Sequence, residues 1–341
     1  MESYKDAIVL VTGGTGSFGN TVVRRLIDQG CAEIRILSRD ETKQDEMRRR
    51  FVDHDNLRFF LGDVRNRQSV DRAMANVDLV FHAAALKQVP SCEFFPSEAV
   101  ATNVDGSRNV VESARTHDVG AVVLLSTDKA VYPINAMGMT KALMEKVGQA
   151  AARELLQEQS KTRVMITRYG NVLYSRGSVV PTFLSQVEAG IPLTVTDPAM
   201  TRFLLPLSES VALVEHAWHN GNNGDVFVRK APACTMGDLA QAVQNLVGKQ
   251  VGTTSLGIRP GEKIHETLVT MAELSRASSS AEYFQIPMDD RDLRYDDYFE
   301  HGEQRPFPEL DYDSSNTEQL DVAGVEALLR TLPELQADLP E

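Results

Sequence analysis

A glycine-rich turn between an apolar segment and an amphipathic one constrains the fold of this chain more than any other feature. Residues 8–12 read Ile-Val-Leu-Val-Thr, and residues 13–19 read Gly-Gly-Thr-Gly-Ser-Phe-Gly. In the spacing Gly-x-x-Gly-x-x-Gly, the first glycine permits a tight turn, the second a close approach of a ligand to the backbone, and the third close packing of the following helix on the sheet. The amides at the start of that helix would face an anion, typically a pyrophosphate. The alternative is a glycine-rich turn that binds no ligand. The apolar strand before the motif and the amphipathic helix after it argue against that alternative. The residues predicted to hold a dinucleotide here are Gly13, Thr15, Gly16, Ser17, Phe18 and Gly19.

Short apolar runs alternate with helical patterns up to about residue 170. The runs are continuously apolar, which is typical of strands covered on both faces of a parallel sheet. We expect strands at 7–12, 33–38, 57–62, 79–83, 121–126 and 163–169. Helices are expected at 19–29, 67–75, 101–117 and 137–158. This order predicts an α/β fold, a doubly wound parallel sheet of the Rossmann type.

The chain changes after residue 170 into shorter pieces rich in Gly and Pro, with helical stretches at 180–189, 208–220 and 236–246. We expect three parts: a Rossmann domain at 1–170, a smaller substrate-binding lobe at 171–285 that is partly interleaved with it, and an acidic C-terminal extension at 286–341. The extension carries the run Asp289-Asp290-Arg291-Asp292 and a terminal helix at 322–332. Its role is open between a latch to another subunit and a support for a lid.

Composition excludes several classes of function. The net charge of −13 disfavours binding to nucleic acid or to an anionic membrane surface. Three scattered cysteines without a Cys-x-x-Cys pair argue against a disulfide framework and against a zinc site, so no metal is expected. Neither a signal peptide nor an apolar run of membrane-spanning length is visible, and we therefore expect a cytoplasmic protein without membrane insertion.

The end of the second expected strand decides which dinucleotide is bound. A carboxylate there binds the ribose hydroxyls of NAD, whereas an arginine accommodates the 2′-phosphate of NADP. The sequence at 38–43 is Ser-Arg-Asp-Glu-Thr-Lys, so Arg39 and Lys43 favour NADP while Asp40 keeps NAD as the alternative. Asp63, after the third strand, can meet the adenine amino group or cap the next helix. The predicted contacts from these two strand ends are Ser38, Arg39, Asp40, Lys43, Asp63 and Val64.

Several further strings, spread over nearly the whole chain, resemble one family. They are His82-Ala83-Ala84-Ala85 within 81–90, Asn103, Ser126-Thr127-Asp128-Lys129-Ala130, 133–138, Lys141, 168–172, 200–203 and 260–263. Together with the glycine turn they resemble the extended short-chain dehydrogenases/reductases, and within these the inverting UDP-N-acetylglucosamine 4,6-dehydratases of surface-polysaccharide synthesis. The resemblance implies a UDP-sugar substrate, tightly held NADP and a homo-oligomer. It also implies cofactor contacts at Ala83, Ala84, Lys141 and Tyr169.

The resemblance implies an acid–base pair. A 4,6-dehydratase oxidises the sugar at C4, removes the C5 proton, expels the C6 hydroxyl as water and returns the hydride to C6. Asp128 would protonate the C6 hydroxyl, and Lys129 would take the C5 proton. This requires a neutral Lys129 and a protonated Asp128 at the moment of elimination. The alternative is an exposed ion pair at the end of a strand.

The sequence departs from the superfamily at the position of its catalytic tyrosine. The motif Tyr-x-x-x-Lys is replaced by Met137-Gly138-Met139-Thr140-Lys141, a change that members of the dehydratase subgroup share. A thioether cannot accept the C4 hydroxyl proton. The acceptor stays open between Thr127, relaying the proton towards Lys141 or water, and ionised Asp128. Lys141 would still contact the nicotinamide ribose.

The remaining predicted site residues concern substrate binding. Asn171 lies where the family contacts the UDP diphosphate, Arg202 and Arg259 offer guanidinium forks for phosphate, and Glu262 can accept hydrogen bonds from the uridine ribose. Lys87 would face the sugar or the cofactor pyrophosphate. For the three basic residues the alternative is an ordinary surface charge. Asn103 is expected to hold a kinked helix.

Two other functions compete with dehydration. A UDP-hexose 4-epimerase shares the C4 oxidation but needs no acid–base pair at C5 and C6. A non-catalytic NADP-binding regulator would explain the lost tyrosine but not Asp128, Lys129 and Lys141 together.

Overall fold

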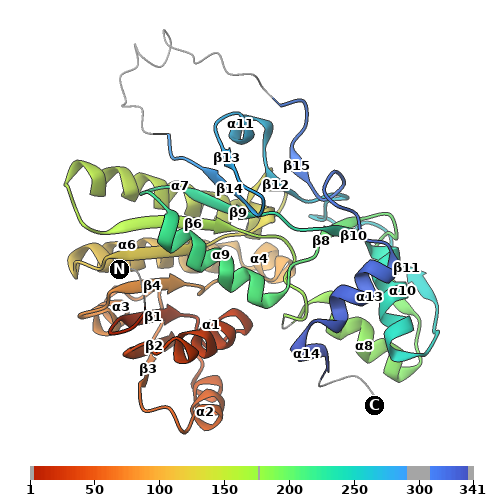
Figure 1. Cartoon of the computed structure of the whole chain (residues 1–341), viewed down its shortest axis with the longest axis horizontal. Coiled ribbons are helices and arrows are strands. Elements are labelled where there is room, and N and C mark those ends of the chain that lie inside the picture. Colours follow the sequence, from red (N-terminus) through yellow and green to blue (C-terminus); the bar gives the residue numbers. More distant parts are fainter. Residues whose placement is uncertain (1–3, 176, 290–307, 337–341) are drawn as a thin grey trace.

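The computed structural model describes residues 4–175, 177–289 and 308–336. Its largest element within these ranges is a sheet with the strand order β13-β14-β9-β6-β5-β4-β1-β2-β3 (Figure 1). The strands are β1 (Ile8–Thr12), β2 (Glu33–Ser38), β3 (Leu57–Leu61), β4 (Leu79–His82), β5 (Ala121–Leu125), β6 (Arg163–Arg168), β9 (Val226–Arg229), β13 (Ser278–Ser279) and β14 (Tyr283–Ile286). All pairs from β3 to β9 are parallel, and β14 pairs antiparallel with β9 and β13. The order β3-β2-β1-β4-β5-β6 confirms the predicted doubly wound fold.

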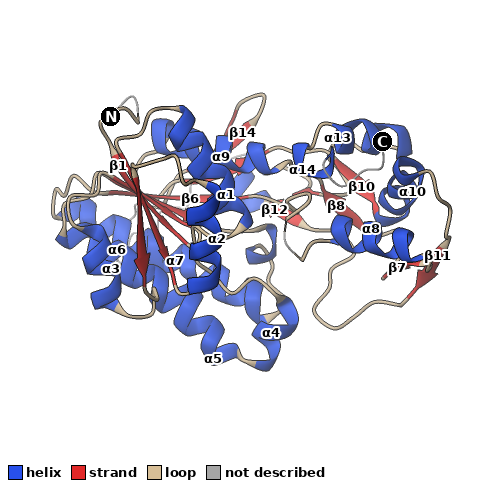
Figure 2. Cartoon of the chain, turned by 90° about the horizontal axis from the view of Figure 1, so that it is seen from below, coloured by secondary structure: helices blue, strands red, loops and turns tan. Residues whose placement is uncertain are grey.

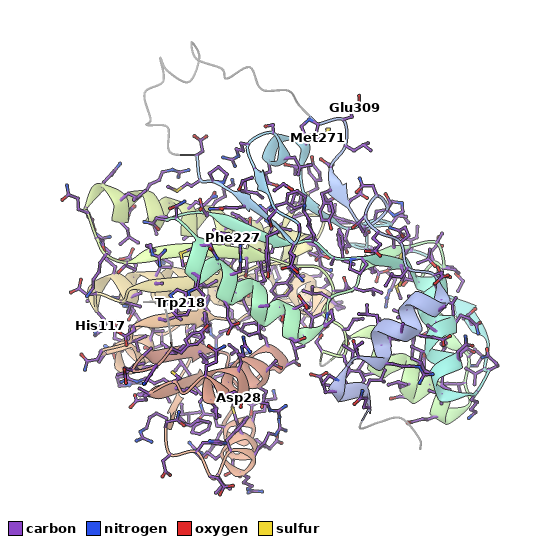
Figure 3. All side chains as sticks on the ribbon, viewed as in Figure 1. Asp28, His117, Trp218, Phe227, Met271 and Glu309 are labelled. Atoms are coloured by element: carbon purple, nitrogen blue, oxygen red, sulfur yellow. The ribbon has the colours of Figure 1, made fainter. Side chains whose placement is uncertain are left out.

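Helices cover both faces of this sheet (Figure 2). One face carries α1 (Ser17–Asp28) and α9 (Leu207–Asn220), and the other carries α3 (Arg67–Met74), α6 (Gly106–Thr116) and α7 (Ala136–Gln157). Burial of both faces of β5 explains why its sequence is continuously apolar. Val122 and Leu124 belong to one buried cluster, and Val123 and Leu125 belong to the other. The second cluster includes Trp218 of α9 and Phe227 of β9, both marked in Figure 3. Alternate side chains therefore enter opposite layers, and none can be polar without cost.

Some elements differ from the prediction. Helix α2 (Glu41–Arg50) was not expected because its sequence is almost entirely polar, and only Gln44 and Met47 are buried. It forms after β2 because the Asp40 carboxylate caps it by accepting a hydrogen bond from the Lys43 amide. The helix expected at 101–117 is two elements, a π-helix η1 (Val100–Asp105) followed by α6. Short helices near the site are α4 (Val89–Phe94), α5 (Pro96–Ala99) and the 3₁₀ helix η2 (Asp128–Ala130).

A smaller lobe lies beside the carboxyl ends of the strands (Figure 1). It contains β7 (Leu193–Val195), β8 (Thr201–Phe203), β10 (Ala233–Thr235), β11 (Thr253–Ser255), α8 (Val179–Ala189), α10 (Met236–Val247), α13 (Val322–Arg330) and α14 (Pro333–Gln336). Its apolar cluster joins α8, α10 and α13. The chain crosses between the two parts, because β9, β13 and β14 belong to the large sheet and α9 packs on it, although all four follow residue 170. No helix among the described residues is both long and apolar enough to cross a membrane.

The last described segment returns towards the sheet. Strand β12 (Thr267–Val269) pairs with β15 (Tyr312–Asp313), next to α11 (Met271–Leu274). Figure 3 places Glu309, near the start of this segment, on the same side as Met271. The Met271 amide donates to the Asp311 carboxylate at 2.7 Å. Of the acidic run Asp289-Asp290-Arg291-Asp292, the residues after Asp289 lie outside the described residues.

Candidate active site

A cleft of about 1080 Å³ extends from the carboxyl ends of the parallel strands to the smaller lobe. In a doubly wound sheet, ligands bind at this edge. Every residue singled out from the sequence for a site lines the cleft. The set comprises Gly13, Thr15, Gly16, Ser17, Phe18, Gly19, Ser38, Arg39, Asp40, Lys43, Asp63, Val64, Ala83, Ala84, Lys87, Thr127, Asp128, Lys129, Met137, Lys141, Tyr169, Asn171, Arg202, Arg259 and Glu262.

The glycine turn has the geometry that its sequence requires. Gly13 has a φ of +66°, and a Cβ there would lie 2.8 Å from backbone atoms of Ala84. Gly16 precedes α1 as its N-cap, and a Cβ at this position would have the Gly13 carbonyl oxygen as its nearest atom, at 3.3 Å. A Cβ on Gly19 would collide with the backbone of Gly14. This third glycine therefore packs the helix against the turn itself, which corrects the expectation that it packs the helix on the sheet. The first amides of α1 lie at the cleft, as a pyrophosphate site requires.

A buried histidine is hydrogen-bonded to Thr12, the residue that precedes this turn. His82 is fully buried, with Nδ1 2.7 Å from the Thr12 hydroxyl and Nε2 2.8 Å from the Ser107 hydroxyl. Ser107 donates its own proton to the Asn103 carbonyl, so it accepts from Nε2–H, and His82 Nδ1 accepts from Thr12. Burial, with a smaller contribution from Lys141, lowers the pKa of His82 to about 3. Asn103 lies in η1, and its side chain binds both backbone groups of Leu86, which supports its expected role at a distorted helix.

The end of β2 presents two basic side chains. Arg39 is half exposed and lies 3.7 Å from the Asp63 carboxylate, and Lys43 lies 2.7 Å from Asp40. The Asp40 carboxylate is engaged both by that ion pair and as the cap of α2. The predicted alternative in which Asp63 caps α3 is wrong, because Asn66 caps that helix. Asp63 instead binds Arg65, and although burial opposes it, this pairing lowers the pKa of the Asp63 carboxyl.

Three charged side chains meet at the end of β5. Lys129 Nζ lies 3.1 Å from Asp128 Oδ1 and 3.3 Å from Glu266 Oε1. The Thr127 hydroxyl donates to the same Asp128 oxygen at 2.7 Å. Asp128 is fully buried and Glu266 is 3% exposed, whereas one quarter of the Lys129 side chain is exposed. The sequence alternative of an exposed ion pair is therefore wrong.

The two carboxylates control the charge of Lys129. Burial lowers the pKa of its amine, but Asp128 and Glu266 together outweigh burial and raise the pKa above its ordinary value. Lys129 is consequently an ammonium at neutral pH in this arrangement. The neutral Lys129 that a C5 base requires is not its resting form, so the amine must lose a proton before it can take one from C5.

Helix α7 brings Met137 and Lys141, the two ends of the altered Tyr-x-x-x-Lys motif, into the cleft. It begins where the Asn135 side chain accepts a hydrogen bond from the Gly138 amide. Met137 is 4% exposed and packs in a small apolar cluster with Cys92 and Ala99. Lys141 donates to the Leu125 carbonyl at 2.8 Å, and burial lowers its pKa to about 8.

The far end of the cleft holds the predicted substrate-binding residues. Arg202 donates to the carbonyls of Thr201, Ile264 and Lys263, so its fork is largely occupied by backbone. Arg259 pairs with Glu262 at 2.7 Å and is mostly exposed. Asn171 Oδ1 and Glu262 Oε2 are buried without a hydrogen-bond partner among the described residues.

Sequence reasoning missed two groups of residues. Glu266 lies three residues beyond the string at 260–263 and reaches Lys129 only through the tertiary fold. The buried Arg168 stands in a family string, yet nothing in that string indicates that it binds Glu145 and Glu273 through both sides of its guanidinium. Ser126 donates to the same Glu145 at 2.5 Å. Neither pairing leaves a local sequence signal.

Fold and cleft together define an enzyme of the extended short-chain dehydrogenase/reductase class. A family model described as "Polysaccharide biosynthesis protein" matches residues 9–288, and one described as "Polysaccharide biosynthesis protein C-terminal" matches residues 289–336. The chain belongs to this polysaccharide biosynthesis protein family.

Relatives and solved structures agree with this membership. Proteins of Rickettsia typhi and Rickettsia prowazekii, both named UDP-glucose 4-epimerase, are each 49% identical over 340 residues, which are 98% of this chain and 99% of the relative. The X-ray structure of Pen from Bacillus thuringiensis is 32% identical with a TM-score of 0.87, over 96% of this chain and 99% of that one. DesIV, a dTDP-glucose 4,6-dehydratase from Streptomyces venezuelae solved with NAD, shares the fold at 23% identity and a TM-score of 0.67, over 75% of this chain and 86% of that one.

Proposed function

We propose that this protein is a UDP-N-acetylglucosamine 4,6-dehydratase, a lyase that holds NADP and makes a 4-keto-6-deoxy nucleotide sugar for a surface polysaccharide. The observation that carries the proposal is the buried cluster of Asp128, Lys129 and Glu266 in the same cleft as the glycine turn. Oxidation at C4 alone does not need such a cluster. Elimination of water across C5 and C6 needs a base and an acid close together.

The cleft fits a nicotinamide dinucleotide at its glycine-rich end. Glycine is required at Gly13 and Gly19, because a Cβ there would overlap backbone atoms of the turn and its neighbours. Helix α1 starts within this turn, so its first amides can bind a pyrophosphate. The basic side chains of Arg39 and Lys43 support NADP, because Asp40 is engaged by α2 and by Lys43. A dinucleotide held there would supply hydride transfer, with the hydride removed from C4 of the sugar and given back at C6.

Thr127 and Asp128 supply a route for the C4 hydroxyl proton that needs no tyrosine. The Thr127 hydroxyl already donates to Asp128 Oδ1. If Thr127 takes the proton from O4 while passing its own to Asp128, the carboxylate becomes a carboxylic acid. Asp128 can then protonate the leaving C6 oxygen, so oxidation at C4 prepares the acid for elimination. The two acceptors left open by the sequence thus act in series.

Epimerisation at C4 is the second candidate, because the curated relatives at 49% identity carry the name UDP-glucose 4-epimerase. An epimerase would oxidise C4, turn the 4-keto sugar and reduce its other face. It would not need a proton acceptor near C5 or a donor near C6. Asp128 can accept the C4 proton in either enzyme, so it is Lys129 with its second buried carboxylate, Glu266, that favours dehydration.

Mass spectrometry of the reaction separates the two candidates. The purified protein is incubated with UDP-N-acetylglucosamine and, in parallel, with UDP-glucose. Dehydration gives a product lighter by one water, and Asp128→Asn is expected to reduce its formation by about a hundredfold or more. A product of unchanged mass and inverted C4 would replace this proposal with the epimerase.

We also propose that the protein forms a homo-oligomer. Four large apolar side chains are exposed on or next to the packed helices α4 and α7: Phe94 at 81%, Phe95 at 64%, Met139 at 53% and Leu143 at 50%. A second copy of the chain would remove these groups from water. Light scattering of Phe94→Asp should then show a smaller species than the wild type, and an unchanged mass would count against this interface.

A further inference from the structure

Glu266 is the one carboxylate of the Lys129 cluster that comes from a distant part of the chain. Its Oε1 lies 3.3 Å from Lys129 Nζ, on an amine that also binds Asp128 at 3.1 Å. Glu266 immediately precedes β12, whereas Asp128 and Lys129 lie in η2 after β5. Two separate elements of the fold are therefore needed to enclose the amine between two carboxylates.

The backbone of Glu266 is held in place by the C-terminal segment. Its amide donates to the Ser314 hydroxyl at 2.9 Å, and its carbonyl accepts from the Ser314 amide at 2.8 Å. Ser314 is itself fully buried, and its hydroxyl lies 2.6 Å from the Thr201 hydroxyl. The carboxylate is thus fixed relative to Lys129 and is not a mobile surface group.

Four charged groups face the Glu266 carboxylate from the surrounding elements. Besides Lys129 and Asp128, they are Arg202 Nε of β8 at 3.9 Å and Lys263 Nζ at 4.0 Å. Burial raises the pKa of Glu266 and Asp128 adds to this, whereas the three cations oppose it, and the net direction is upward. Its Oε2 is buried without a hydrogen-bond partner among the described residues. Glu266 is consequently a buried carboxylate that accepts a proton more readily than an exposed one.

We propose that Glu266 takes a proton from the Lys129 ammonium and thereby makes the Lys129 amine available as the base for C5, an inference that rests on the dehydratase function proposed above. Glu266 does not contact the sugar in this proposal. It acts through Lys129, as a positioning residue that holds the proton released by the amine. The unusual arrangement of one amine between two buried carboxylates then has a purpose that a simple ion pair would not need.

The proton transfers balance. Lys129–NH₃⁺ and Glu266–COO⁻ become Lys129–NH₂ and Glu266–COOH, so the charge of the pair stays the same. The amine then takes the C5 proton, and the electron pair of the C5–H bond forms the C5–C6 double bond. The C6–O bond breaks, and the oxygen leaves as water with the proton from Asp128. After the hydride returns to C6, the Lys129 ammonium protonates C5, and the Glu266 proton passes back to the Lys129 amine, which restores the resting charges of the pair.

A purely structural ion pair predicts the opposite effect of one substitution. If Glu266 only holds Lys129 in its charged form, Glu266→Gln lowers the pKa of Lys129 and leaves more of it as the neutral base. Removal of the C5 proton would then be equal or faster. If Glu266 accepts the proton, Glu266→Gln removes the acceptor and C5 proton removal becomes slower.

The test measures deuterium at C5 of the product formed from UDP-N-acetylglucosamine in D₂O, together with the absorbance of reduced nicotinamide as a record of C4 oxidation. We expect Glu266→Gln to slow C5 exchange by about a hundredfold while reduced nicotinamide still forms. Glu266→Asp keeps a carboxylate and should recover part of the loss. Glu318→Gln, which makes the same change on an exposed side chain, should behave as the wild type.

Each result bears on a different claim. Equal or faster exchange in Glu266→Gln overturns the role of Glu266 and leaves the dehydratase intact. Loss of both C4 oxidation and C5 exchange in Glu266→Gln and Glu266→Asp alike shows a structural role and also overturns it. Absence of C5 exchange in the wild type would refute the dehydratase, and the inference with it.

Discussion

Replacing His82 by glutamine tests whether the stability of the structure that supports the glycine turn depends on a histidine that stays neutral. His82 accepts a hydrogen bond from Thr12, which directly precedes the glycine turn, and donates to Ser107. Protonation would place a second N–H against Thr12, whose hydroxyl also accepts from the Ala84 amide. Glutamine carries a donor and an acceptor but does not titrate.

The magnitude follows from the pKa of His82, which burial lowers from 6.5 to about 3. Between these values the unfolded chain binds a proton that the folded chain does not, so the free energy of unfolding falls as the pH falls. At pH 7.5 His82 is neutral in both states and contributes no pH dependence. At pH 5 the wild type should have lost about 2 kcal/mol through this residue, at about 1.4 kcal/mol for each pH unit below 6.5.

The assay is urea unfolding of the wild type and His82→Gln at pH 7.5 and at pH 5. At pH 7.5 the variant should be less stable by about 1–2 kcal/mol, because a glutamine amide cannot point its acceptor at Thr12 and its donor at Ser107 in the directions of the two ring nitrogens, and about one buried hydrogen bond is lost. At pH 5 that difference should shrink or reverse, because only the wild type has the histidine titration while all other groups are common to both proteins. An unchanged difference between the two pH values would refute the buried neutral histidine.

Three further predictions concern the turn, the cofactor and the buried core. Gly16→Ala should keep the melting temperature but weaken dinucleotide binding by more than about tenfold. Gly19→Ala should lower the melting temperature even without a dinucleotide, because its Cβ meets the backbone of the turn. Calorimetry of both variants, with and without the dinucleotide, measures these two effects. Arg39→Ser should reduce the preference for NADP over NAD by about tenfold or more in titration calorimetry, and an unaltered ratio would remove Arg39 from phosphate recognition. Glu145→Gln should cost about 3–5 kcal/mol of stability in urea unfolding, because it leaves the buried Arg168 with one carboxylate instead of two, and a loss below about 1 kcal/mol would show that Glu273 suffices.

The parallel sheet was predictable because its signal is local. Runs such as 121–125 are buried on both faces, and the strand positions follow within a residue or two. The polar helix α2 was not predictable by the same means. It buries only Gln44 and Met47, and its start depends on the cap from Asp40 rather than on an apolar stripe.

The candidate site divides in the same way. Gly13, Asp128 and Lys141 stand in strings with fixed spacing, and all three line the cleft. Glu266 belongs to no such string near Lys129, and its contact exists only because β12 lies beside η2. The charge of Lys129 could not be predicted for the same reason, since it depends on a carboxylate that the fold supplies.

In the proposed dehydratase, the sugar lies with its C5 and C6 against the buried cluster while its C4 faces the cofactor end of the cleft. A crystal structure with NADP and UDP-N-acetylglucosamine measures this directly. We predict the C6 oxygen about 3 Å from the Asp128 carboxylate, with C5 turned towards Lys129 Nζ. A sugar bound with only its C4 hydroxyl near Thr127, and with C5 and C6 directed away from Asp128 and Lys129, would contradict the account.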